Sequence, residues 1–189
     1  MISQEELVAM CRRGDSAGYT GLYNQHATAV YSTIRRLVEH TGEAEDILQE
    51  SFVAAFKSIE GFKNTGGFRA WVKRIAINKA VDLIRKRKIS FIELEPNLGL
   101  EQEEELVDEI AFEFTMDVVA EAIESLPEAY RTVFNLAAIE NLPHTEIARM
   151  LGLENNTVRT QYHRARHKIL IFLKERGYHG KRTGEIHTK

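Results

Sequence analysis

Hydrophobic residues recur every three or four positions through most of the chain, which is the spacing of one face of an α-helix. The stretch after Gly42 shows this most clearly, because its apolar positions form one stripe with polar residues between them. The chain has only three prolines, and long segments lack both proline and glycine. The pattern predicts an all-α fold, and the buried face of the helix after Gly42 is expected to hold Leu48, Phe52, Ala55, Phe56 and Ile59.

Short polar sequences predict where the helices of the first half begin and end. Ser3–Glu6 has the spacing of a capping box, and Gly14-Asp15 is expected to end the first helix. A second helix is predicted over residues 17–40, with a break at Thr41-Gly42. After a glycine-containing loop, helix is expected to resume at residue 68 and to run to about residue 88.

The second half of the chain predicts a helix-turn-helix. Ser125–Glu128 resembles a capping box with proline in the first helical turn. Pro143 is expected to open a short helix, Gly152 to end it, and a longer helix to follow, which are the parts of this motif. The predicted inward residues are Ile147, Ala148 and Leu151 in the short helix, and Val158, Tyr162, Ala165, Ile169 and Phe172 in the long one.

A change of composition separates the two halves. Residues 89–113 hold Pro96, Asn97 and Gly99 and then a run of glutamates, which is typical of an extended, weakly ordered connection. We therefore predict two small helical domains joined by an acidic linker. Their expected bounds are 1–90 for the first domain, 91–115 for the linker, 116–178 for the second domain and 179–189 for a polar tail.

The formal net charge of −3 argues against a nucleic-acid-binding protein until the charges are placed along the chain. Residues 63–88 hold nine Lys or Arg and one acid, residues 93–109 hold eight acids and no base, and residues 159–176 hold six Lys or Arg and one acid. Phosphate binding depends on such local patches. The two basic blocks therefore indicate DNA binding, although solvated helix faces would produce the same pattern.

Several features predict a cytoplasmic location. The single cysteine, Cys11, cannot form an internal disulfide, which suits a reducing compartment. The N-terminus lacks the basic start and apolar core of a secretory signal. No apolar run approaches the roughly 18 residues that a membrane span needs.

The polar face of the final helix is the main candidate for base contacts. It consists of Asn156, Arg159, Thr160, His163 and His167, and its N-terminal half would offer donors to base edges in the major groove. An ordinary amphipathic basic helix is the alternative. His163 and His167 also have the spacing of a two-histidine zinc site, but the arginines between them disfavour a metal. No metal or cofactor is predicted, and Arg164, Arg166 and Lys168 are placed within reach of phosphates.

Two blocks of residues resemble the sigma-70 family of bacterial transcription initiation factors. The block that resembles sigma region 2 comprises Glu45–Phe52, Phe68–Trp71 and Arg74–Asn78. The block that resembles sigma region 4 comprises Leu126–Glu128, Arg131, Val133-Phe134, Glu140, Glu146–Ala148, Leu151-Gly152, Thr157–Arg159 and Arg164–Arg166. Two blocks in this order, without further recognisable domains, are the mark of the extracytoplasmic-function (ECF) group.

The resemblance implies a sigma factor without enzymatic activity and without catalytic residues. Such a factor binds core RNA polymerase, directs it to promoter DNA and helps to open that DNA, and an anti-sigma factor is an expected further partner. The first domain would bind the polymerase clamp and the minus-ten element, and the second domain the flap tip and the minus-thirty-five element. The rival from the same motif is a free-standing helix-turn-helix regulator, which would not need the polymerase-binding face or the glycine loop.

The resemblance also assigns roles to individual residues. Polymerase binding falls on Asp46, Gln49 and Glu50. The expected contacts to the minus-ten region are Lys63, Asn64, Gly66, Gly67, Phe68, Arg69, Lys73, Arg74, Asn78 and Arg85. The expected contacts to the upstream element are Asn156, Thr157, Arg159, Thr160, His163, Arg164, Arg166, His167, His144 and Thr145.

Two further expectations depend on particular side chains. Phe62, Phe68 and Trp71 are candidates for a pocket that holds an unstacked base, although Trp71 fits a core better. Glu154 stands where the family has a capping residue, so Asn155 is expected to cap the recognition helix.

The remaining rival is a metal-dependent enzyme. It would use the acid cluster Glu43, Glu45, Asp46 and Glu50, as inward carboxylates do in helical bundles. No Glu-x-x-His pair accompanies these acids, and the sequence therefore disfavours this reading.

Overall fold

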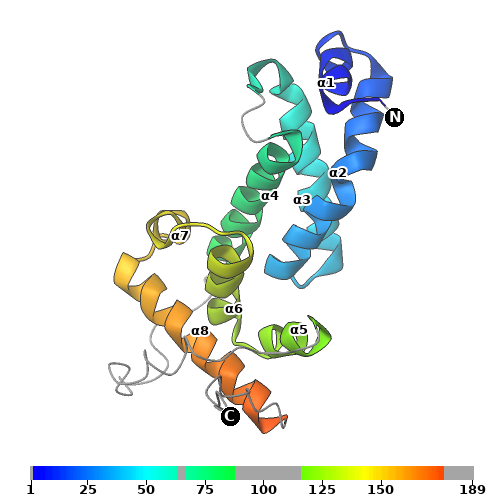
Figure 1. Ribbon diagram of the computed structural model, residues 1–189. Helices are drawn as coiled ribbons and strands as arrows, with labels where there is room; N and C mark the ends of the chain where they lie inside the picture. The colour runs from blue at the N-terminus through cyan, green and yellow to red at the C-terminus, as the bar shows by residue number, and fades with distance from the viewer. Residues whose placement is uncertain (1, 64–66, 88–115, 177–189) are drawn as a thin grey trace, which may run out of the picture. The chain divides into compact units, whose positions relative to one another are not determined.

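The structure is a computed structural model that describes residues 2–63, 67–87 and 116–176. All regular elements in these ranges are helical, as predicted (Figure 1). The predicted linker at 91–115 and tail at 179–189 lie outside the described residues, as do Asn64 and Gly66.

The described residues form two compact units. Residues 148–153, which include the second half of α7, are grouped with the first unit. The first unit otherwise holds α1 (Gln4–Arg12), α2 (Ser16–Leu37), α3 (Thr41–Lys57), the short 3-10 helix η1 (Ile59–Gly61) and α4 (Gly67–Lys86). The rest of the chain gives α5 (Met116–Glu124), α6 (Glu128–Phe134), the π-helix η4 (Asn135–Ile139), α7 (His144–Leu151) and α8 (Asn155–Glu175).

The first helix begins as its sequence predicts. The Ser3 hydroxyl accepts a hydrogen bond from the Glu6 N–H at 3.2 Å, and the Glu6 carboxylate accepts one from the Ser3 N–H at 2.9 Å. Two backbone donors that the helix leaves without internal acceptors are thereby satisfied. The Arg12 guanidinium at the other end of α1 donates to the carbonyl of Phe62 at 2.7 Å, which ties α1 to the segment before α4.

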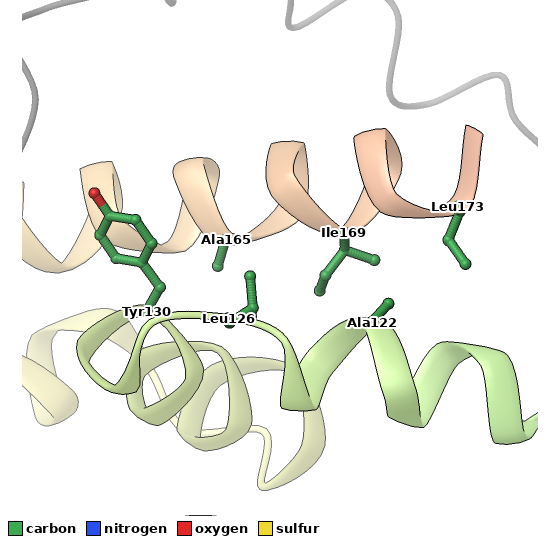
Figure 2. Close-up of a cluster of buried hydrophobic side chains, with 6 residues drawn as sticks. All are labelled: Ala122, Leu126, Tyr130, Ala165, Ile169 and Leu173. Carbon is green, nitrogen blue, oxygen red and sulfur yellow. The ribbon is translucent and has the colours of Figure 1, made fainter. Parts of the chain in front are cut away.

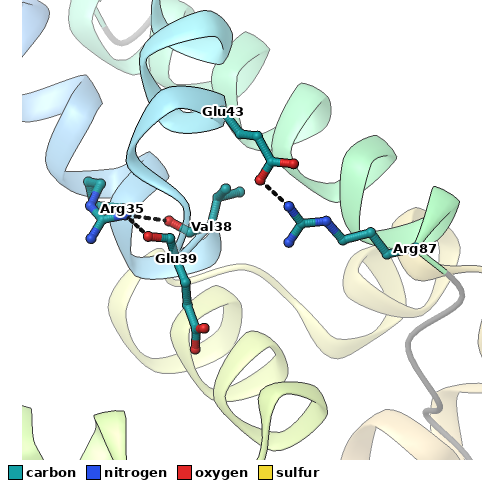
Figure 3. A network of polar contacts seen from close by, with 5 residues as sticks. All are labelled: Arg35, Val38, Glu39, Glu43 and Arg87. Atoms are coloured by element: carbon teal, nitrogen blue, oxygen red, sulfur yellow. Dashed lines mark hydrogen bonds and ion pairs between the residues drawn. The ribbon is translucent and has the colours of Figure 1, made fainter.

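The break between α2 and α3 lies three residues earlier than predicted. Thr41 and Gly42 do not interrupt the helices but form the first turn of α3, whose N-cap is His40. The chain instead leaves α2 at Val38, which is extended and buried. The Arg35 guanidinium donates to the carbonyl of Val38 at 3.1 Å and also to that of Glu39, so carbonyls beyond the helix end are satisfied (Figure 3).

Aromatic rings fill the centre of the first unit. Phe68 has no exposed surface, and its ring lies 6.2 Å from that of Phe56 and 5.8 Å from that of Phe62. The helix α3 contributes the predicted buried residues Leu48, Phe52 and Ala55, while Phe56 is only partly buried. Ile59 is buried as well, but it lies in η1 and not in α3.

A separate hydrophobic core holds the second unit together. Figure 2 shows the C-terminal half of α8 lying along α5 and the start of α6, with Ala165, Ile169 and Leu173 facing Leu126 and Ala122. The buried stripe of α8 differs from the prediction. Tyr162 and Phe172 lie at its edge and are partly buried, whereas Gln161 and Leu173 are buried.

The predicted capping box before α6 is absent. The N-cap is Pro127, which makes no side-chain capping bond, and the Ser125 hydroxyl donates to the carbonyl of Ala122 at 2.7 Å. Ser125 therefore closes the end of α5 and does not open α6. Proline has no N–H that would need an acceptor at the start of a helix.

The turn of the helix-turn-helix is confirmed. Gly152 follows α7 with φ +69°, a left-handed conformation that favours glycine. The Leu153 N–H then donates to the carbonyl of Ala148 at 2.9 Å. Ile147, Ala148 and Leu151 are buried as predicted.

Candidate nucleic-acid interface

The start of α8 presents the residues that were predicted to contact bases. Its N-cap is Glu154, which is extended and makes no side-chain capping bond, so the expectation that Asn155 caps the helix is wrong. The Glu154 carbonyl accepts from the Val158 N–H at 3.2 Å, which begins the helix at Asn155. Asn156 and Arg159 are exposed, and Thr157 and Thr160 are partly buried.

The remaining upstream-element candidates lie on the next turns of α8 and at the start of α7. His163, Arg164, Arg166 and His167 are partly buried, His144 is partly buried, and Thr145 is exposed. The rings of His144 and Tyr162 lie 5.0 Å apart, which joins the start of α7 to α8.

Positive charge gathers around His144. Burial lowers the pKa of its imidazole, and His163 and Arg159 lower the pKa further. The structure therefore places Arg159 and His163 close enough to His144 to interact with it electrostatically. The sequence does not reveal this proximity, because 15 or more positions separate His144 from the other two. Such an arrangement attracts a polyanion.

The helix α4 carries the second predicted set. Arg69, Asn78 and Arg85 are exposed on it, Lys73 and Arg74 are partly buried, and Lys63 is exposed in the segment before it. Gly67 begins the helix with φ +83°, where glycine is favoured. Arg74, Asn78 and Arg85 recur at i, i+4 and i+11, so they share one basic face of α4 that can follow a DNA backbone.

Phe68 does not belong to that face. Its exposed fraction is 0%, and Phe62, the second aromatic of the predicted pocket, is 5% exposed. A base can stack only on a ring with a free face. Trp71 is partly buried, with its ring 4.9 Å from that of Phe62, so it packs on the edge of this core as expected. We leave Phe68 out of the proposed contact set.

Carboxylates from α3 pair with Lys79 of α4 and with Arg87, which directly follows α4, a feature that the sequence did not indicate. Lys79 donates to Glu50 at 2.7 Å, and Arg87 pairs with Glu43 (Figure 3). The hydrogen bond from Lys79 and its charge lower the pKa of Glu50. Only the packing of α3 against α4 brings these residues together, since 29 and 44 positions separate them.

The predicted polymerase-binding face of α3 is exposed. Asp46, Gln49 and Glu50 all lie on the outer side of the helix, beside Val53, which is 51% exposed. The face thus combines acidic groups, an amide and an exposed apolar side chain. It can dock on a basic helical partner that also offers an apolar surface.

No group of three or more His, Cys, Asp or Glu side chains in residues 2–63, 67–87 and 116–176 is arranged to hold a metal ion. None of the helices in those ranges is both long enough and apolar enough to cross a membrane.

Comparison with known proteins decides the family. Residues 22–89 match sigma-70 region 2, and residues 116–169 match sigma-70 region 4. The chain is 30% identical over 182 residues to the RNA polymerase sigma-H factor of Pseudomonas aeruginosa, a match that covers 89% of this chain and 94% of that protein. The chain belongs to the ECF group of the sigma-70 family.

Other proteins are also similar to this chain. The ECF RNA polymerase sigma factor SigW of Bacillus subtilis is 29% identical over 172 residues, which cover 86% of this chain and 92% of SigW. The solved structure of CnrH in complex with the cytosolic domain of CnrY is 27% identical, covers 89% of this chain and 96% of that one, and has a TM-score of 0.49. As an ECF sigma factor, the chain functions in the initiation of transcription at promoters.

Proposed function

We propose that the ECF sigma factor divides promoter recognition and polymerase binding among three surfaces. The exposed start of α8, with His144 and Thr145, binds the minus-thirty-five element. The basic face of α4, with the segment before it, binds the minus-ten region. The acidic face of α3, defined by Asp46, Gln49 and Glu50, binds core RNA polymerase. The proposed domains are residues 1–90 and 116–178.

The arrangement of α8 carries the proposal. A glycine turn leads into a helix whose first exposed side chains, Asn156 and Arg159, are an amide and a guanidinium. Both groups form paired hydrogen bonds with base edges in the major groove, the amide with adenine and the guanidinium with guanine. Farther along, Arg164 and Arg166 flank the same face within reach of phosphates.

A free-standing regulator would share α8 but would not need the α3 face. That face is exposed, acidic and adjacent to an exposed valine. The family membership supports polymerase binding there, and it also supports an anti-sigma factor as a third partner. A sigma factor should bind its promoter only together with core polymerase, whereas a free-standing regulator should bind its DNA site without core polymerase.

Substitutions on α8 test the assignment of roles. Arg159→Ala is expected to cost about 1–3 kcal/mol at one base pair of the upstream element and to relax the preference there. Arg164→Ala is expected to weaken binding to all sequences alike and to flatten the salt dependence by about one unit. The measurement is the affinity of the holoenzyme for a set of duplexes with single base changes.

Lys174→Ala is the matched control. Lys174 is an exposed cation in the last turn of the same helix, away from the proposed contacts. It should leave base preference and affinity at the parental values. Equal losses for Arg159→Ala on every sequence would show that Arg159 does not contact a base.

A further inference from the structure

Tyr162 lies at a junction of three segments in the second half of the chain. Its ring stacks on that of Phe134, the last residue of α6, with centroids 6.0 Å apart and planes 17° apart. The imidazole of His144, the first residue of α7, lies 5.0 Å away with its plane tilted by 56°. One side chain of α8 therefore connects the end of α6 with the start of α7.

The same ring has two charged or titratable neighbours on its own helix. The guanidinium carbon of Arg166 lies 5.9 Å from the ring centroid, and the ring of His163 lies 6.1 Å from it. His144, His163 and Arg166 all belong to the proposed upstream-element set. Tyr162 does not belong to that set, yet it contacts three of its members.

The position of Tyr162 in α8 explains how its ring can contact both Phe134 and the side chains proposed to bind DNA. Val158 and Ala165 have exposed fractions of 0% and form the centre of the buried stripe. Tyr162 is partly buried and stands at the edge of that stripe. Its ring thus stacks on Phe134, which packs against the core, and also lies beside the side chains proposed to meet DNA.

Contact with the ring of Tyr162 restricts the side chains of Arg166 and His144 before DNA binds. A long cationic side chain loses rotamer freedom when it binds a phosphate, and it loses less when a ring already orients it. An aromatic face attracts a guanidinium through its quadrupole and so restricts it before DNA arrives. His144 belongs to a different helix, so its placement relative to α8 depends on the ring that packs between them.

We propose that Tyr162 is a positioning residue for promoter binding: its ring holds His144 and Arg166 in the orientations in which they contact the DNA backbone. Tyr162 acts through these two residues and does not itself contact DNA. The inference rests on the proposed role of α8. The interactions are made by the ring, so Tyr162→Phe keeps them, and Tyr162→Met removes them while an unbranched apolar side chain remains.

A double-mutant cycle tests this role. The holoenzyme is formed from core RNA polymerase and the full chain, and its affinity is measured by fluorescence anisotropy for a duplex that the parental holoenzyme selects. Tyr162→Met is expected to weaken binding by about 5- to 20-fold and to flatten the salt dependence by about one unit. Tyr162→Phe is expected to restore affinity to within about two-fold, because the ring is retained.

The decisive readout is coupling between the ring and Arg166. In the Tyr162→Met background, Arg166→Ala should cost much less affinity than in the parent, because the ring no longer orients the guanidinium. Equal costs in both backgrounds would overturn the proposal, and so would parental affinity and salt dependence in Tyr162→Met. All variants are compared below their melting temperatures, and Tyr162→Leu replaces Tyr162→Met if the methionine variant does not fold.

Failure of the proposed binding of α8 to the upstream element would give a different result. If α8 did not bind the upstream element, Arg159→Ala would leave the affinity of the holoenzyme unchanged as well. A loss with Arg159→Ala, together with additive effects of Tyr162→Met and Arg166→Ala, would retain the role of α8 and reject that of Tyr162.

Discussion

The two helices proposed to bind DNA hold their charged side chains differently. Lys79 on α4 and Arg87, which directly follows it, are paired with carboxylates that α3 supplies. On α8, the exposed Arg159 has the imidazoles of His144 and His163 in its electrostatic neighbourhood. Two cations beside α4 therefore have carboxylates of α3 as partners, whereas Arg159 and His163 both act on the imidazole of His144 beside the start of α8.

This difference suggests two modes of binding. A phosphate that approaches Lys79 must replace Glu50, and an exposed ion pair of this kind contributes only about 0.2–1 kcal/mol. A phosphate that approaches α8 meets the exposed guanidinium of Arg159 and favours protonation of the imidazole of His144 beside it. We therefore expect α8 to respond more strongly to salt and pH than α4 does.

The aromatic residues of the two helices differ as well. Phe68 of α4 is enclosed by the rings of Phe52, Phe56 and Phe62, whereas Tyr162 of α8 stands at the edge of its core. An aromatic residue near a basic block therefore has no fixed role. Its burial decides whether it stabilises the fold or orients the residues that bind.

The largest expected effect comes from removing the buried ring. Phe68→Ala should destabilise the first unit by about 3–5 kcal/mol, since it leaves a cavity among four neighbouring aromatic side chains. Trp71, the single tryptophan, lies 5.8 Å from Phe68 between ring centroids, so its fluorescence follows the unfolding of this unit in urea.

Phe172→Ala serves as the control for that measurement. Phe172 is a partly buried ring that packs against the core of the second unit. Its removal should leave the Trp71 transition where it is in the parent. A cost below about 1 kcal/mol for Phe68→Ala would mean that the ring is not held in a packed core, and would return it to the list of base-stacking candidates.

A smaller effect concerns the pH dependence of stability, to which each unit contributes one histidine. Burial and then the charge of Arg69 lower the pKa of His26 in the first unit, and burial, His163 and Arg159 lower the pKa of His144 in the second. The unfolded chain therefore binds protons more readily than the folded chain at both sites. Stability should fall as the pH drops below the ordinary histidine value of 6.5, and should level off below the folded pKa values.

DNA binding should depend on pH with the opposite sign. A phosphate beside His144 favours the protonated imidazole, so affinity for the upstream element should rise as the pH falls from about 7.5 to about 6. His144→Gln should reduce this dependence by at most about one proton per site, measured as the slope of the logarithm of affinity against pH. His26→Gln should keep the parental slope, and a parental slope in His144→Gln would place His144 outside the interface.

Local rules predicted much of this fold because the interactions they describe are local. The capping box at Ser3 and the glycine turn at Gly152 each involve groups within five residues. The burial of Leu48, Phe52 and Ala55 on α3 followed from helical periodicity alone. The resemblance to sigma regions 2 and 4 was also carried by short blocks, and the family is confirmed.

The wrong predictions arose where tertiary contacts outweighed a local signal. Thr41-Gly42 has the composition of a break, but the burial of Val38 and the bonds of Arg35 to the carbonyls of Val38 and Glu39 place the break earlier. Ser125 has the spacing of a cap, yet it bonds to the preceding helix. The pairs that α3 makes with α4, and the contacts of Tyr162, depend on helix packing that no spacing in the sequence encodes.

The central claim is that polymerase binding and upstream-element binding belong to different helices, α3 and α8. Competition for limiting core RNA polymerase, read by promoter-directed run-off transcription, tests it most directly. Excess Arg159→Ala protein should occupy the core enzyme and suppress transcription by the parent. Asp46→Lys combined with Glu50→Lys should not compete, although Glu60→Lys, which reverses an exposed charge in η1, should compete like the parent. The account is contradicted if the folded double-reversal protein competes for core polymerase as strongly as the parent does.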